Sequence, residues 1–118
     1  MPYKASHQYA RISPRKVRAL ADLVRGKFAD EALDILRFQP HRGARMLEKV
    51  IKSALGNAEN QQASGIDDLV VVDARIDPGP MFKRIRPRAR GQAFGIKRRM
   101  SHIKVALDAA PVADVAAE

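Results

Sequence analysis

The 118-residue sequence contains no cysteine and no tryptophan. Without cysteine the chain cannot form a disulfide, a cysteine-based zinc site or a thiol nucleophile, and this absence fits a reducing compartment. No apolar run approaches the roughly 18 residues of a membrane-spanning helix. The first residues, MPYKASHQ, lack the apolar stretch of a secretory signal. We therefore expect a cytoplasmic protein without a membrane partner.

Groups suited to catalysis are also scarce. The three histidines, His7, His41 and His102, are scattered along the chain and form no i, i+4 pair that could hold a metal. The glycine-containing stretch RGQAFG lacks the Lys-Ser/Thr ending of a phosphate-binding loop. We expect no catalytic residue, no metal site, no cofactor and no small-molecule substrate, so the chain is not predicted to be an enzyme.

Acidic residues are missing from one long stretch. Residues 81–107 contain nine Lys or Arg and no Asp or Glu, and residues 1–27 contain seven basic residues and one acidic residue. Between them, residues 28–80 contain six basic and nine acidic residues, and the formal net charge of the chain is +9. An ordinary soluble surface mixes both signs. Two basic zones on either side of a near-neutral body therefore indicate a polyanionic partner.

Helical periodicity first appears close to the N-terminus. Ser13-Pro14 is typical of a helix N-cap followed by proline at the first helical position, and Gly26 is typical of a helix end. The apolar spacing between them predicts a helix over residues 14–25. The basic residues of this helix are expected to point away from its apolar side: Arg15, Lys16 and Arg18.

Two further helices are predicted in the middle of the chain. Asp30 is expected to cap a short helix that ends before Pro40. The longest helix is predicted from His41 to about Asn60. Its internal Gly56 costs about 1 kcal/mol relative to Ala, which suggests a close packing contact at that position.

Strand periodicity replaces helical periodicity in the second half. Residues 70–76 are expected to form a strand with Val70, Val72, Ala74 and Ile76 on its buried face, after which Pro78-Gly79-Pro80 interrupts it. In residues 103–107, the apolar side chains of Ile103, Val105 and Leu107 alternate with Lys104 and Ala106, which predicts a second strand. Residues 3–12 are a candidate edge strand.

The basic stretch between the two inner strands is predicted to be a long hairpin. Its simplest form is an antiparallel ribbon with a turn near residues 88–91. Arms of about ten residues would reach roughly 30 Å from the body, and such a ribbon is marginal by itself in water. A disordered basic loop in the free protein is the alternative. Either form needs a partner to hold its shape.

Several nucleic-acid-binding interpretations remain open at this point. Phe82 and Phe94 lie among the cations and could stack on exposed bases, or they could pack across the hairpin arms. A helix-turn-helix would need a basic second helix, whereas this one carries Asp30, Glu31 and Asp34. A DNA-associated, chromatin-like protein remains the alternative to an RNA-binding protein.

Five segments, in order and spacing, resemble one known family. They are ISPRKVRALADLVRGK, EALDILRF, SALGNAEN, DDLVVVDARIDPGP and FKRIRPRARGQAFGIKRRMSHI. The chain resembles, over about residues 4–107, the bacterial large-subunit ribosomal protein family numbered twenty-two. This resemblance implies an α+β fold in which three helices pack on a small three-stranded antiparallel sheet and one long β-hairpin protrudes. Residues 1–109 would form a single domain with the hairpin at about 78–104, and residues 110–118 a disordered tail.

The resemblance also implies a function and its residues. The protein would be a structural constituent of the large ribosomal subunit that binds large-subunit rRNA, supports its assembly and contacts neighbouring ribosomal proteins. The hairpin tip would line the exit tunnel and meet the nascent peptide. The implied rRNA-binding residues are Arg11, Arg15, Lys16, Arg18, Lys83, Arg84, Arg86, Lys97, Arg98, Arg99 and His102. The implied tunnel tip is Pro87, Arg88, Ala89, Arg90 and Gly91. Gln92, Gly95 and Met100 depart from the side chains common in the family.

Overall fold

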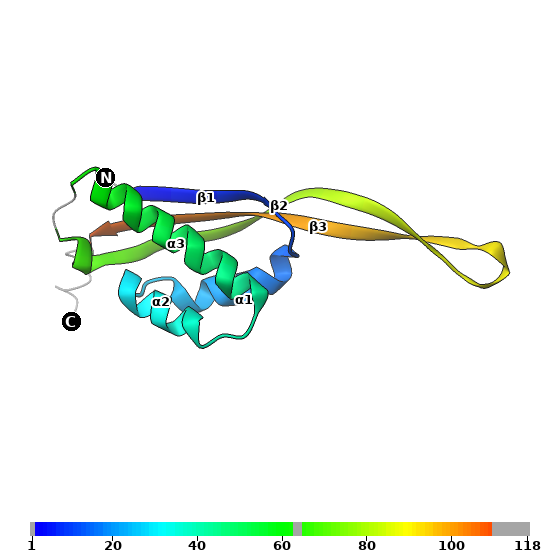
Figure 1. The fold of residues 1–118 in the computed structure, drawn as a ribbon, viewed down its shortest axis with the longest axis horizontal. Coiled ribbons are helices and arrows are strands. Elements are labelled where there is room, and N and C mark those ends of the chain that lie inside the picture. Colours follow the sequence, from blue (N-terminus) through cyan, green and yellow to red (C-terminus); the bar gives the residue numbers. More distant parts are fainter. Residues whose placement is uncertain (1, 63–64, 110–118) are drawn as a thin grey trace.

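The computed structural model describes residues 2–62 and 65–109 (Figure 1). The expected tail, residues 110–118, lies outside the described residues. The elements follow one another as β1 (Tyr3–Ala10), α1 (Pro14–Val24), α2 (Ala29–Arg37), α3 (Arg42–Asn60), the 3-10 helix η1 (Ile66–Asp68), β2 (Leu69–Pro87), the 3-10 helix η2 (Ala89–Gly91) and β3 (Ala93–Ala109). The expected α+β fold is confirmed.

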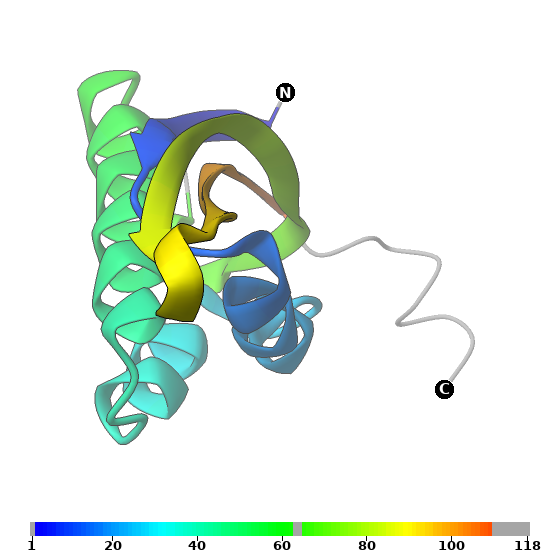
Figure 2. The same cartoon turned by 90° about the vertical axis from the view of Figure 1, so that its right-hand side faces the viewer.

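The sheet is antiparallel with the order β1-β3-β2, so β3 is central and β1 is an edge strand as predicted. The helices cover one side of the sheet, as the view along the hairpin shows (Figure 2). The core between them combines the apolar faces of the strands and helices. Its largest fully buried side chains are Leu36, Leu47, Ile51, Ile103, Leu107, Val17, Val24 and Val71.

The predicted starts of the helices are right for α1 and α3 but wrong for α2. Ser13 and His41 precede α1 and α3, and Gly26 follows α1 with φ +85°. The residue before α2 is Phe28, not Asp30. The reason is tertiary: the chain just before α2 pairs with the edge of β2, where the Val71 N–H donates to the Lys27 carbonyl at 2.9 Å. The helix therefore begins immediately after Phe28.

One prediction about β2 is wrong and another is confirmed. Val71 is buried and Val72 is 40% exposed, whereas the alternation placed Val72 inside. A β-bulge between Val71 and Asp73 shifts the register against β3 and reverses the inward side. The predicted interruption at Pro78-Gly79-Pro80 is a second register shift, between Pro78 and Met81, after which β2 continues. Gly79 allows this because the ring of His102 approaches to 3.3 Å of where a Cβ would lie.

The glycine that makes a close helix contact is not the predicted one. A Cβ added at Gly56 would meet no atom within 4 Å. In the first turn of α3, a Cβ at Gly43 would lie 3.1 Å from Ile12 Cδ1, 3.2 Å from Val17 Cγ2 and 3.3 Å from Leu20 Cδ1. Gly43 is thus where α3 packs tightly against α1 and the segment before it.

The outer edge of β2 is protected by Arg18 of α1 and by Arg25, the residue that follows α1. The Arg18 guanidinium donates to the Ile76 carbonyl at 3.2 and 3.3 Å, and the Arg25 guanidinium donates to the Ala74 carbonyl. The N–H of Gly26 donates to the Val71 carbonyl at 2.8 Å. An open strand edge invites pairing with other chains, and these donors occupy it over the body.

Beyond the body, β2 and β3 continue as a twisted two-stranded hairpin, and the molecule measures 66 × 30 × 24 Å (Figure 1). The strands stay paired from Met81↔Arg99 to Pro87↔Ala93. The turn is at the predicted place: Arg90 and Gly91 have φ values of +64° and +70°, and the Arg88 N–H donates to the Gln92 carbonyl at 2.6 Å. Residues 81–95 are all exposed, so no core supports this ribbon.

We expect the hairpin of the free protein to open far more often than the body. Its arms bury little, and Lys83 lies directly opposite Lys97, a like-charge pair that destabilises a ladder. Amide hydrogen exchange measured on the isolated protein should show residues 83–99 nearly unprotected and α1 and α3 protected. Slow exchange along both arms in isolation would contradict this expectation.

Candidate nucleic-acid interface

The two basic zones of the sequence meet at the base of the hairpin. A groove of about 950 Å³ lies there between the hairpin arms and the starts of α1 and α3. It is lined by eight Lys or Arg residues: Arg11, Arg15, Lys16, Arg42, Arg84, Lys97, Arg98 and Arg99. Its described lining contains no Asp or Glu. Cations far apart in the sequence therefore form one surface.

Four acidic residues of the body form ion pairs away from the groove. Ion pairs join Arg25 to Asp22, Arg45 to Glu48, Arg75 to Asp73 and Lys104 to Asp77. Among the described residues, no cation of the groove has a carboxylate within 4.0 Å. Eight positive side chains gathered without a counter-charge repel one another, so this arrangement favours an external anion.

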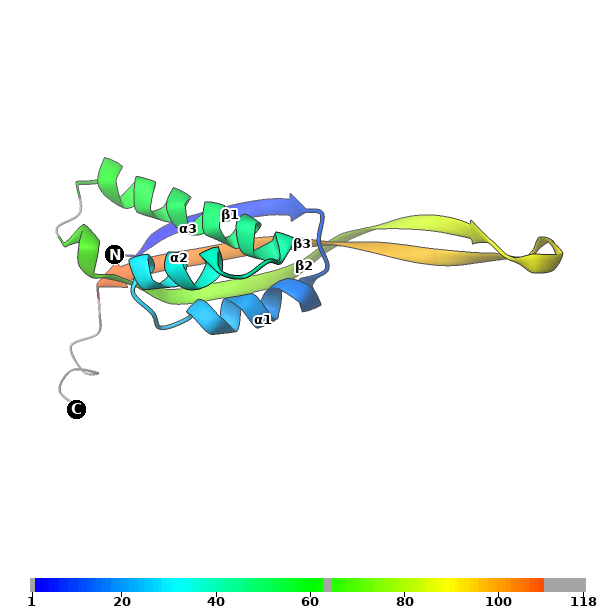
Figure 3. The same cartoon turned by 60° about the horizontal axis from the view of Figure 1, so that its bottom comes forward.

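Two helix N-termini reinforce this positive field. Both α1 and α3 begin at the end of the body from which the hairpin leaves (Figure 3). Neither helix has an acidic residue in its first turn, whereas α2 carries Asp30 and Glu31 there. A helix N-terminus carries a partial positive charge and free N–H groups that suit phosphate oxygens. Cations at such ends weaken a helix until an anion neutralises them.

Phe82 connects the N-terminal basic zone to the hairpin. The guanidinium carbons of Arg11 and Arg84 lie 5.7 and 5.0 Å from the centre of its ring. The Arg42 guanidinium also donates to the Arg11 carbonyl. Near the tip, Arg88 lies 5.7 Å from the ring centre of Phe94. Both phenylalanines therefore lie within cation–π distance of arginines of the same chain.

Seven of the eleven predicted rRNA-binding residues line the groove, and four do not: Arg18, Lys83, Arg86 and His102. Lys83 and Arg86 lie exposed on the outgoing arm. Arg18 binds the Ile76 carbonyl and faces a smaller hollow of about 550 Å³ that Arg15, Pro78 and Arg99 also line. The predicted tip residues, 87–91, are all exposed at the far end of the hairpin.

His102 has a role within the fold. Its Nδ1 accepts a hydrogen bond from the Tyr9 N–H at 3.1 Å, and the two rings meet edge to face at 5.0 Å. Tyr9 has a left-handed φ of +60° next to the irregularity in β1. The neighbouring Ser101 is fully buried and donates to the Ile12 carbonyl at 2.6 Å. These two side chains attach the end of β1 to β3.

Sequence reasoning missed His41 and Arg42, which line the groove from the start of α3. The sequence carried only a weak signal for these two residues. Helix starts usually prefer acidic residues, whereas α3 begins with basic residues and has no acidic residue in its first turn. Of the residues that depart from the family pattern, buried Met100 lines the groove. Gly95 has no atom within 4 Å of a Cβ position, so the fold itself does not require glycine there.

Other kinds of site are absent from the described part of the chain. Among the side chains that the structure describes (residues 2–62, 65, 66 and 68–109), no three His, Asp or Glu gather in a way that could hold a metal ion. No described helix is both long and apolar enough to cross a membrane. The basic groove is therefore the candidate functional site of the described residues.

Comparisons with known proteins agree with this chemistry. The sequence model of the family described as "Ribosomal protein L22p/L17e" matches residues 5–108. The chain is 66% identical over 110 residues to "Large ribosomal subunit protein uL22" of Rhodopirellula baltica, covering 89% of this chain and 92% of the relative. It is 54% identical over 103 residues to the protein of that name from Caldicellulosiruptor saccharolyticus, covering 87% and 84% of the two chains. It is 52% identical over 108 residues to the protein of that name from Desulfotalea psychrophila, covering 92% of this chain and 98% of the relative.

These matches decide between the interpretations that the sequence left open. They favour a structural protein of the large ribosomal subunit, working in the cytoplasm, over a DNA-associated protein. They also agree with the expectation that the chain is not an enzyme. With a basic groove, a long hairpin and a family match over nearly its whole described length, the chain belongs to the L22p/L17e family of ribosomal proteins.

Proposed function

We propose that this chain binds large-subunit rRNA through the groove at the base of its hairpin and so supports assembly of the subunit. The observation that carries the proposal is the set of eight groove cations without a carboxylate partner among the described residues. Folded RNA offers phosphates on several sides of a protein segment. A groove between a hairpin and two helix starts can therefore hold more than one phosphate.

Binding in the groove follows from the side chains that line it. The arginines offer planar forks that grip a phosphate with two hydrogen bonds, and Lys16 and Lys97 add point charges. Each phosphate that is neutralised releases counterions from the RNA, which favours binding at low salt. Arg11 and Arg84 both lie within cation–π distance of the Phe82 ring, so the two basic zones are brought to the same place on the groove wall.

The hairpin extends the interface away from the body. Its arms add Lys83 and Arg86, and the absence of acidic residues from 81–107 removes repulsion against surrounding phosphates. We assign the tip, residues 87–91, to the wall of the exit tunnel, where it meets the nascent peptide. Support comes from its exposure at the end of the ribbon and from the resemblance to the ribosomal family. Neighbouring ribosomal proteins complete the proposed set of partners.

The groove assignment is tested by the salt dependence of binding. Replacing Arg15, Arg84 and Arg98 with Gln should flatten the plot of log affinity against log salt by about 2–3 units, close to 0.9 for each lost phosphate contact. The measurement is filter binding of large-subunit rRNA at several salt concentrations. Lys4, Lys49 and Lys52 are exposed and lie outside the groove lining. Their triple Gln variant is a matched control that should keep the parent slope, and equal slopes for both triple variants would refute the assignment.

A further inference from the structure

The short connection between α2 and α3 presents an exposed aromatic ring. Phe38, the residue that follows α2, is 83% exposed, the largest value among the exposed large apolar side chains of the described residues. Burying such a ring removes much apolar area from water, so a ring left this exposed is a favourable contact for a partner. Neither the core nor the groove uses it.

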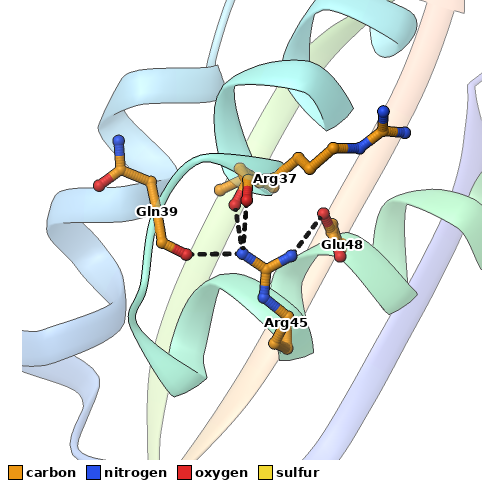
Figure 4. A network of polar contacts seen from close by, with 5 residues as sticks. Arg37, Gln39, Arg45 and Glu48 are labelled. Atoms are coloured by element: carbon orange, nitrogen blue, oxygen red, sulfur yellow. Dashed lines mark hydrogen bonds and ion pairs between the residues drawn. The ribbon is translucent and has the colours of Figure 1, made fainter.

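The loop that carries Phe38 is held firmly. The Arg45 guanidinium, in the first turns of α3, donates to the carbonyls of Leu36, Arg37 and Gln39 at 2.8, 3.0 and 2.6 Å (Figure 4). It is fixed in turn by Glu48, 2.9 Å away. One side chain thus binds three backbone carbonyls on the two sides of Phe38. The ring is presented on a preorganised support, which lowers the entropy cost of binding it.

The charged residues that neighbour Phe38 in the sequence are mainly basic. Arg37 precedes it, and His41 and Arg42, three and four residues later, already line the groove. Glu48 is paired with Arg45, and Asp34, one helical turn before Phe38, is the nearest other carboxylate along the chain. The connection lies at the same end of the body as the hairpin base (Figure 3). A partner that reaches the ring therefore meets cations on its way from the groove.

We propose that Phe38 stacks on an unpaired nucleobase of the same RNA whose phosphates occupy the groove. This inference rests on the proposed function and adds a base-stacking subsite to it. A nucleobase fits the observations because any base offers a flat face to an aromatic ring while its own phosphate is drawn to nearby cations. A protein pocket fits less well, because it would require a wider apolar patch, and Pro40 is the only other exposed apolar residue between Arg37 and Arg42.

Stacking has a signature that differs from phosphate binding. Phe38→Leu keeps an apolar side chain of similar reach and removes the aromatic face, and it should weaken RNA binding by about tenfold. Because no phosphate contact is lost, the slope of log affinity against log salt should stay at the parent value. Phe38→Tyr should restore the affinity, since the ring is kept. Weakening by Phe38→Tyr equal to that by Phe38→Leu would overturn the stacking assignment.

A single tryptophan gives a direct test, because the chain has none of its own. The Phe38→Trp variant is titrated with large-subunit rRNA, and its fluorescence should be quenched as the indole stacks on a base. The control is Leu23→Trp on α1, where Leu23 is 46% exposed and lies outside the groove lining, and its fluorescence should change little.

The outcomes separate this inference from the one it rests on. If Phe38→Trp binds the rRNA with parent affinity but its fluorescence does not change, the stacking subsite is wrong and the groove proposal stands. If its fluorescence changes only when other ribosomal proteins are added, the ring docks on a protein, which also overturns the inference. If the parent chain itself fails to bind the rRNA, the proposed function falls and the subsite falls with it.

Discussion

Reversing two charges on the return arm, Arg98→Glu with Arg99→Glu, is expected to exclude the protein from assembled large subunits. Both residues line the groove, and Arg99 also faces the smaller hollow beside α1. The reversal would place two carboxylates against RNA phosphates at the base of the hairpin, where like-charge contacts cost several kcal/mol. Each tagged variant is expressed in cells that also contain the parent protein. The measurement is the amount of the variant found in the large subunits purified from those cells.

The matched control reverses two lysines outside the groove, Lys49→Glu with Lys52→Glu on the exposed side of α3. Both pairs of reversals change the net charge equally, so a difference between them reports position rather than total charge. The control should enter subunits at a level much closer to that of the parent. Normal incorporation of the Arg98/Arg99 reversal would show that the groove does not bind the RNA.

The hairpin tip should behave in the opposite way. Deleting residues 88–90 leaves Gly91-Gln92 between the paired residues Pro87 and Ala93, a two-residue connection with Gly first that suits a type II′ turn. The arms and the groove stay intact, so incorporation should persist. Because the proposed tip meets the nascent peptide, the expected change is in nascent-peptide stalling. Loss of incorporation on tip deletion would contradict this division of labour.

Replacing Gly43 with Val is expected to lower the free energy of unfolding by about 1–3 kcal/mol. A Cβ there would already lie 3.1–3.3 Å from side-chain atoms of Ile12, Val17 and Leu20, and the two methyl groups of Val would add further overlap. The measurement is the midpoint of urea unfolding followed by circular dichroism. Since Gly43 and Ile12 also line the groove, separating α1 from α3 should weaken RNA binding as well.

Gly56→Ala is the paired control within the same helix. No atom lies within 4 Å of its Cβ position, so the substitution should raise the stability by about 1 kcal/mol through helix propensity alone. Destabilisation at both glycines, or at neither, would mean that the contact with α1 does not explain the glycine at position 43.

Much of the fold could be predicted because its signals are local. Ser13-Pro14, Gly26 and the apolar spacing between them mark α1 on the chain itself, and the left-handed turn at Arg90 and Gly91 falls within the expected stretch. The alternation at Ile103, Val105 and Leu107 placed the central strand correctly. What failed depended on distant partners. Phe28 precedes α2 because its segment pairs with β2. The bulge after Val71 is set by the pairing of β2 with β3.

The candidate site divides in the same way. Side-chain charge is a property of the residue, so counting Lys and Arg along the chain found seven of the eight groove cations and the positive hairpin. Whether a cation faces a partner or the protein's own backbone is a property of packing. Arg18 binds a carbonyl of β2 and His102 accepts from the Tyr9 N–H, and nothing near them in sequence indicates either contact.

By itself, the sequence determined the charge of this protein, the helical and strand periods, the place of the turn and, through its motifs, the family. Tertiary structure alone decided that the two basic zones form one groove, that the start of α3 contributes Arg42 to it, and that Phe38 stands exposed on a loop held by Arg45. The physical reason is that charge and periodicity are set over a few neighbouring residues. A groove is set by which elements pack together, and here those elements are joined by contacts between residues dozens of positions apart, such as Arg11 with Phe82 and Ile12 with Ser101.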